Sequence, residues 1–193
     1  TIEALGLSIS LAGVVRGKGG AAKAMTPTSN WGDFLRTEKV IQQSAVMKQQ
    51  IIDIRANLPS GLKREGNVAV AHVNIDGLPL RVSAHSRIDT PTLSQVAQGI
   101  VGKSSGIFST QTLPSKTGAM IPRATDSEAK ILDSIAKQLG NKMTTTGTVN
   151  IFTERPACVS CLGVVEQFKA KYPNIQVNVL DNNGVVLRPL RKN

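Results

Sequence analysis

The chain has 193 residues, which is enough to bury one hydrophobic core and leaves room for a small accessory segment. Its 23 Lys and Arg residues outnumber its 13 Asp and Glu residues, and the resulting formal net charge of +10 suits a polyanionic partner. Only two cysteines are present and two residues separate them, which argues against a disulfide-stabilised secreted scaffold and favours a metal site or a redox pair.

Residues 1–60 are predicted to form a linker followed by a helical segment. The apolar run Leu5–Val15 is broken by serines and is far shorter than the about 20 residues of a membrane span, and no basic stretch marks it as a signal peptide. Glycines and a proline then predict a loosely structured stretch up to residue 30. From Trp31 to Leu58 apolar residues recur at helical spacing, and Pro59-Ser60-Gly61 ends the helix. Because the chain starts with Thr, we expect it to be a piece of a longer protein.

Residues 61–193 are predicted to form the catalytic domain, which opens with a β-hairpin. Asn67–Ile75 alternates as a strand does, Asp76-Gly77 is a typical hairpin turn, and Leu78–Ala84 returns. Residues 85–125 are rich in Ser, Thr, Gly and Pro, with one expected short helix at Thr92–Val101. A stretch of that length with little regular structure is often a binding loop or lid.

The last third of the chain alternates between helices and strands. Apolar periodicity predicts helices and β-branched runs predict strands, and the expected elements are helix Ser127–Leu139, strand Thr148–Thr153, helix Cys158–Tyr172, strand Ile175–Leu180 and a final strand Val185–Leu187. Strands joined through helices imply a mixed sheet in a layered α/β domain with helices packed on its faces.

Two short patterns at predicted helix starts carry the candidate chemistry. Cys158 and Cys161 lie one helical turn apart, so both sulfurs face the same side and can occupy two corners of a tetrahedron around Zn²⁺. Asp126 opens the other helix and can supply a third corner through a carboxylate oxygen. Glu128, two residues further on, can remain unbound and move a proton between a zinc-activated water and a leaving amine.

These residues resemble the zinc nucleobase deaminase signature, which is H-x-E followed by P-C-x-x-C. Asp126-Ser127-Glu128 is similar to the first half with Asp in place of His, and Pro156-Ala157-Cys158-Val159-Ser160-Cys161 is similar to the second with one inserted residue. The segments 126–132, 152–161 and 168–175 resemble the bacterial polymorphic-toxin deaminases, over about residues 61–181. If Asp126 does not bind the metal, His85 at the end of the second strand is the alternative ligand.

The resemblance implies a cytidine deaminase-like fold and a zinc-dependent deamination of cytosine to uracil in DNA or RNA. Asp126, Cys158 and Cys161 would be the metal ligands, Glu128 the catalytic acid and base, and His85 a substrate contact or ligand, unless it is merely a satisfied polar residue. Such domains are the C-terminal toxin parts of secreted bacterial effectors, act in the cytoplasm of the target cell and are neutralised by a cognate immunity protein.

The residues are also compatible with three other functions. The two cysteines could form a thiol–disulfide redox module, or they could hold a structural zinc in a non-catalytic nucleic-acid-binding domain. A deaminase of free nucleosides would use the same residues as one that acts on a polymer. Phe108, in the long loop, could stack on an extruded base or pack on the core.

Overall fold

The computed structural model describes residues 31–115, 117–180 and 186–187, and the side chains of all of these except 31–41 and 186–187. The expected linker at 1–30 therefore lies outside the described residues. The elements before the site are α1 (Trp31–Ala56), α2 (Ser60–Lys63), β1 (Val68–Asn74), β2 (Arg81–His85), α3 (Leu93–Ala97) and β3 (Ile100–Val101). A hairpin of β4 (Thr112–Pro114) and β5 (Met120–Pro122) follows, and then η1 (Arg123–Thr125), α4 (Ser127–Leu139), β6 (Gly147–Thr153), α5 (Val159–Lys171), β7 (Ile175–Leu180) and β8 (Val186–Leu187).

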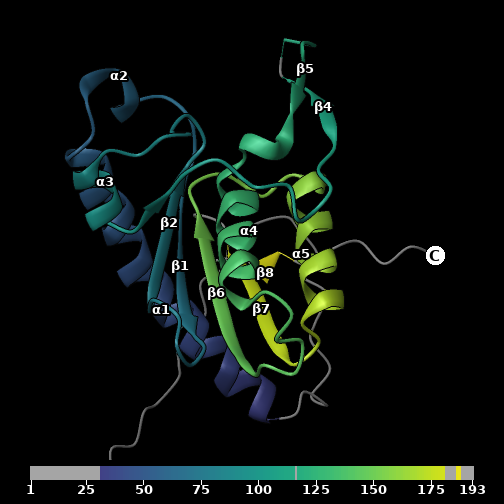
Figure 1. Ribbon diagram of the computed structural model, residues 1–193. Coiled ribbons are helices and arrows are strands. Elements are labelled where there is room, and N and C mark those ends of the chain that lie inside the picture. The colour runs from purple at the N-terminus through teal and green to yellow at the C-terminus, as the bar shows by residue number, and fades with distance from the viewer. Residues whose placement is uncertain (1–30, 116, 181–185, 188–193) are drawn as a thin grey trace, which may run out of the picture.

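The central sheet is mixed, as the sequence predicts, and its strand order is β3-β2-β1-β6-β7-β8. Strand β1 is antiparallel to both β2 and β6, β7 is parallel to β6, and β8 runs antiparallel to β7. Helix α5 makes the crossover that parallel β6 and β7 require. In Figure 1, α4 and α5 lie on one face of the sheet and α1 lies on the other.

Each face of the sheet has its own buried core. On the α4 and α5 face, the apolar stripe of α4 packs against alternate residues of β1 and β6, and its members Ile131, Leu132, Ile135 and Leu139 are all buried. On the α1 face, four residues of α1 and of the turn after it pack on the intervening strand residues: Met47, Ile51, Ile54 and Leu58. The second half of α1 therefore shares a core with the sheet, and the division of the chain after residue 60 stays a prediction.

The hairpin between β1 and β2 forms where it is expected, but its return strand begins later. Gly77 takes a positive φ of 78°, and the Leu78 amide donates to the Ile75 carbonyl oxygen at 3.2 Å, which closes the turn. Pro79 has no amide hydrogen to donate, and regular pairing starts at Arg81 rather than Leu78.

Residues 85–125 contain more regular structure than predicted. The expected helix at Thr92–Val101 is a five-residue helix, α3, capped by Thr92, and it is followed by the two-residue strand β3, which extends the sheet. The β4–β5 hairpin is an unpredicted element. No helix in the described part of the chain has the length and apolar character needed to cross a membrane.

Candidate active site and metal centre

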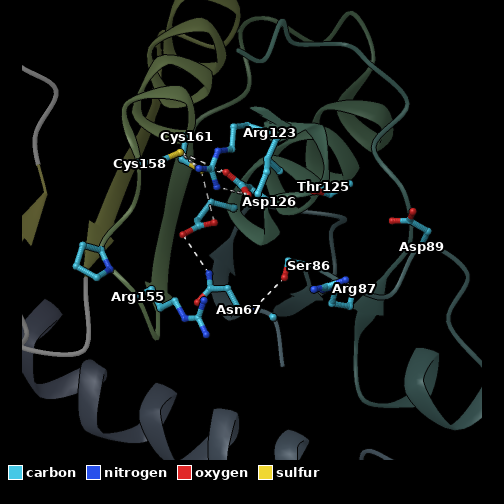
Figure 2. Close-up of a pocket in the computed structure, with 14 residues that line it drawn as sticks. Asn67, Ser86, Arg87, Asp89, Arg123, Thr125, Asp126, Arg155, Cys158 and Cys161 are labelled. Carbon is cyan, nitrogen blue, oxygen red and sulfur yellow. Dashed lines mark hydrogen bonds and ion pairs between the residues drawn. The ribbon is translucent and has the colours of Figure 1, made fainter. Parts of the chain in front are cut away.

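The starts of α4 and α5 meet at the end of the sheet where β6 finishes. Asp126 is the residue that precedes the first turn of α4, and Cys158 precedes the first turn of α5. Neither side chain makes a capping hydrogen bond to its own helix. Both side chains are therefore free to point toward each other, as Figure 2 shows.

Three atoms that could bind a metal converge between these helices. The Oδ2 oxygen of Asp126 lies 3.3 Å from the sulfur of Cys158 and 3.3 Å from the sulfur of Cys161, and the two sulfurs are 3.4 Å apart. For bond lengths of about 2.0–2.3 Å, two corners of a tetrahedron of zinc ligands are separated by about 3.3–3.8 Å. The three atoms thus have the spacing of three corners of a tetrahedral zinc site.

The charges of this cluster also call for a cation. Burial raises the pKa of the Glu128 carboxyl, and the neighbouring Asp126 raises it further, against the hydroxyls of Thr153 and Ser127. The hydrogen bond between the sulfurs lowers the pKa of Cys158 and, together with burial, raises the pKa of Cys161. Two carboxyls and two thiols this close cannot all ionise without a compensating positive charge, and a divalent metal would supply it.

Glu128 is buried beside the three atoms of this candidate group and is not part of it. Its Oε2 oxygen lies 3.7 Å from the sulfur of Cys161, and only 3% of the residue is exposed. Its position in the first turn of α4 places it next to the cluster, and its two carboxylate oxygens accept hydrogen bonds from Asn67 and Ser127 at 3.4 and 3.3 Å. A buried carboxyl with a raised pKa can hold a proton near neutral pH and release it during a reaction.

Asn67, which sequence reasoning missed as a site residue, lies across the cavity from the cluster. Its side-chain amide donates to the hydroxyls of Ser127 and Thr153 at 2.7 and 2.8 Å, and more weakly to Glu128 at 3.4 Å. Its Oδ1 oxygen is buried with no hydrogen-bond partner among the described residues. Asn67 could have been identified as a site residue only from the antiparallel pairing of β1 with β6, because this pairing brings the residue before β1 to the end of β6.

A cavity of about 520 Å³ opens over these residues. Its inner end is acidic and holds Asp126, Glu128 and both cysteines. Three arginines from separate segments also line it, namely Arg87, Arg123 and Arg155, together with the exposed Asp89, and Figure 2 shows the arginines on different sides of the cluster. This size is within the range of sites for a nucleotide-sized ligand.

The structure does not bring His85 to the cluster. Its Nε2 donates to the carbonyl oxygen of Leu62 at 3.3 Å, and its Nδ1 accepts the amide hydrogen of Arg87 at 3.0 Å. Burial lowers the pKa of this imidazole, and both ring nitrogens have partners. His85 pairs with Val68, which faces α1, so its side chain lies on the sheet face opposite to α4 and α5.

Phe108 lies in the core rather than at the cavity. Its ring centroid is 5.9 Å from that of Phe168, and only 7% of the residue is exposed. Of the two roles considered for Phe108, the structure therefore shows core packing.

A mixed sheet whose paired helix starts present two thiols, a carboxylate and a separate buried glutamate fits a deaminase of the cytidine deaminase-like type. A family model agrees: residues 51–183 match the toxin deaminases described as the BURPS668_1122 family of deaminases. The chain belongs to this family and is a hydrolytic deaminase. No curated protein and no solved structure matches the chain.

Proposed function

We propose that this chain is a zinc-dependent deaminase that converts cytosine to uracil in a nucleic acid. The observation that carries the proposal is the convergence of Asp126, Cys158 and Cys161, whose ligand atoms lie within 4.8 Å of one another, with Glu128 buried beside them. Family membership supports the deamination, and the donor set of two sulfurs and one oxygen supports zinc.

Asp126, Cys158 and Cys161 would hold the zinc, which when bound acts as a Lewis acid that makes a neighbouring water more acidic. Glu128 accepts a proton from the attacking water as the water oxygen bonds to C4 of cytosine. Glu128 delivers this proton to N3, takes a second proton from the hydroxyl group now on C4, and passes it to the exocyclic amino group. The bond from C4 to nitrogen then breaks with release of ammonia, and the C4 oxygen becomes the carbonyl of uracil. The buried amide of Asn67 holds Glu128 in place through the hydroxyls that both residues share.

A polymeric substrate is favoured over a free nucleoside by the charge outside the reacting centre. Arg87 and Arg155 are exposed at the rim of the cavity, and the net charge of the chain is +10. Cationic side chains around an acidic pocket attract the phosphates of a strand while the target base enters, either from a single strand or flipped out of a duplex.

The biological setting follows from the family of toxin deaminases and is part of the proposal. The domain, taken as residues 61–193, would be the toxin part of a bacterial effector delivered into the cytoplasm of a target cell, and a cognate immunity protein would neutralise it. A protein partner that covers the cavity in Figure 2 would block access to the site.

Glu128→Gln tests the proposal because it removes the titrating carboxyl while keeping the side-chain shape. We expect the variant to retain stoichiometric zinc and to lose deamination by about 10²-fold or more. Glu166→Gln is the matched control, because Glu166 is an exposed residue of α5 that pairs with Lys169 on the surface. DNA and RNA from cells expressing each protein are sequenced for C-to-T and C-to-U changes, and near-normal conversion by Glu128→Gln would remove Glu128 from the mechanism.

The wild-type chain and the Glu128→Gln variant also distinguish the proposed deaminase from a redox module and from a non-catalytic zinc domain. A redox module would show reversible oxidation of Cys158 and Cys161, no stoichiometric zinc and no need for Glu128. A non-catalytic zinc domain would bind nucleic acid in a salt-sensitive way without converting a base. Cys158→Ser is expected to release the metal, which metal analysis of the purified protein measures.

A further inference from the structure

The β4–β5 hairpin stands apart from the central sheet. In the part of the chain that the structure describes, its two strands pair only with each other, with Leu113 opposite Ile121 and Pro114 opposite Met120. In Figure 1 the hairpin projects beyond the end of the sheet at which α4 and α5 begin. It therefore rises from the rim of the active site rather than from the body of the fold.

Both strands of the hairpin are tied to the metal-binding segments. Strand β5 leads through η1 directly to Asp126, and the amide of Arg123 donates to the carbonyl oxygen of Gln111 at 2.9 Å, which closes the base of the hairpin. The amide of Gln111 donates in turn to the hydroxyl of Ser160, which lies between the two cysteines, at 2.9 Å. The base of the hairpin is thus held in a fixed position relative to both halves of the site.

Ile121 is the large aliphatic side chain that this hairpin presents to the cavity. It lines the cavity and is 37% exposed, whereas the adjacent Met120 is 63% exposed and is not part of the lining. Successive residues of a strand point to opposite faces, which explains the difference. No aromatic side chain is among the described residues that line the cavity, so a base that packs here meets Ile121 and not an aromatic ring.

The charge around Ile121 identifies its occupant. Arg123 follows it by two residues and lines the same cavity, as do exposed Arg87 and Arg155. The lining also includes exposed Asp89, and Arg87 lies 3.9 Å from Glu65, so the cations are in excess but not alone. An apolar surface between cations suits a nucleotide, whose base has an apolar face and whose phosphates are anionic. The reacting base must reach Glu128 at the acidic inner end, so the outer apolar surface is left for a neighbouring base.

We infer that the β4–β5 hairpin forms the subsite for the nucleotide next to the reacting cytosine, and that Ile121 packs on the face of that neighbouring base. The inference rests on the proposed function, because it assumes a strand with cytosine in the pocket. It makes the hairpin the element that sets which sequence contexts are deaminated.

The test is a binding cycle that combines a change in the protein with a change in the neighbouring base. The protein carries Glu128→Gln to prevent turnover, alone or with Ile121→Ala. The probes are single-stranded fluorescent oligonucleotides, as DNA and as RNA, with one cytosine and either intact neighbours or an abasic site on its 5′ or 3′ side. Fluorescence anisotropy measures the Kd of each pair.

We expect the abasic site on one of the two sides to weaken binding by about tenfold in the parent protein and by only about twofold in Ile121→Ala, because the base and the side chain then no longer interact. Met120→Ala is the matched control, since it truncates an exposed neighbour that faces away from the cavity. It should respond to the abasic site as the parent does, and thermal unfolding should show that both variants are folded.

The inference is overturned if Ile121→Ala and the parent lose the same factor with both abasic probes, or if Met120→Ala behaves as Ile121→Ala does. Turnover of the intact probes by the wild-type chain is measured separately. Uracil formation without the expected coupling leaves the proposed function standing and rejects the subsite. Coupling without uracil formation supports the contact and rejects the proposed function.

Discussion

Replacing Arg55 by Met removes the side chain that joins α1 to the segment before β1 and to Glu154, the residue after β6. The guanidinium of Arg55 donates from Nε and Nη2 to the two carboxylate oxygens of Glu154 at 2.9 and 2.6 Å. It also donates to four carbonyl oxygens in the segment that leads from α2 to β1. These belong to Leu62, Lys63, Glu65 and Gly66. Glu154 in turn accepts the amide hydrogen of Val68 at 2.9 Å, so the network spans α1, this segment and the ends of β1 and β6.

The size of the effect follows from the burial of the pair. The side chains of Arg55 and Glu154 are 17% and 24% exposed, so solvent screens their interaction only in part. Removing one partner of a buried pair costs about 3–5 kcal/mol, and partial exposure places the expectation at about 3 kcal/mol. In a chain of this size that loss lowers Tm by about 6–12 °C.

The same substitution should also change activity, because the segment held by Arg55 continues into Gly66 and Asn67, which line the cavity. A looser Asn67 would no longer hold Glu128 through Ser127 and Thr153, so we expect kcat to fall even at temperatures where the variant is fully folded. Urea unfolding followed by circular dichroism measures the stability, and the deamination assay measures kcat.

Arg64→Met is the matched control, because Arg64 is exposed in the same segment and its loss changes the net charge equally. It should alter the free energy of unfolding by no more than about 0.5 kcal/mol. Equal stability and equal kcat of Arg55→Met and Arg64→Met would refute the role given to the network.

Two further predictions concern the stability of the sheet and of the long loop. Ile51→Ala should lower the free energy of unfolding by about 2–4 kcal/mol because Ile51 is buried against the sheet. The control Ile52→Ala, which truncates the exposed neighbour, should change it by less than about 0.5 kcal/mol. Equal effects of the two substitutions in urea unfolding would contradict the packing of α1. Asp133 is buried, which by itself raises its pKa, but hydrogen bonds from Ser105 and Ile107 together outweigh burial and lower it. A carboxyl with a lowered pKa stabilises the fold above its unfolded pKa of about 3.9 and loses that contribution as pH falls through the folded value. Asp133→Asn should therefore cost about 2 kcal/mol at pH 7 and progressively less below about pH 4 in urea titrations, and a cost independent of pH would exclude this explanation.

Local patterns predicted the elements whose structure depends on neighbours in the sequence. The helix Ser127–Leu139 and the strand Ile175–Leu180 have the predicted bounds, because an apolar stripe or a β-branched run between turn residues specifies them. The β4–β5 hairpin could not be found in this way. Its strands have three residues each, and its base is held by Ser160, which lies 49 residues from Gln111.

The candidate site residues also differ in whether neighbouring residues in the sequence are enough to predict them. Asp126, Glu128 and the two cysteines were found because each lies at a helix start that the pattern predicts. His85 and Asn67 could be distinguished only from the register, since a shift of one residue along a strand moves a side chain to the other face. His85 pairs with Val68 on the α1 face, whereas Ala69 pairs with Thr153 on the face of α4 and α5, where the hydroxyl of Thr153 meets Asn67.

The charge of Asp126 explains why this site needs features that a histidine ligand would not require. Two thiolates and a carboxylate carry one more negative charge than two thiolates and a neutral imidazole, so a bound divalent zinc would leave the set anionic. Figure 2 shows Arg123 beside Asp126, and the Nη1 of Arg123 lies 3.7 Å from Oδ1, the oxygen that faces away from the sulfurs. The starts of α4 and α5 add further positive potential. Because Arg123 lies three residues before Asp126, at the junction of the hairpin and α4, the same short segment would supply the proposed ligand, offsets its charge and anchors the hairpin.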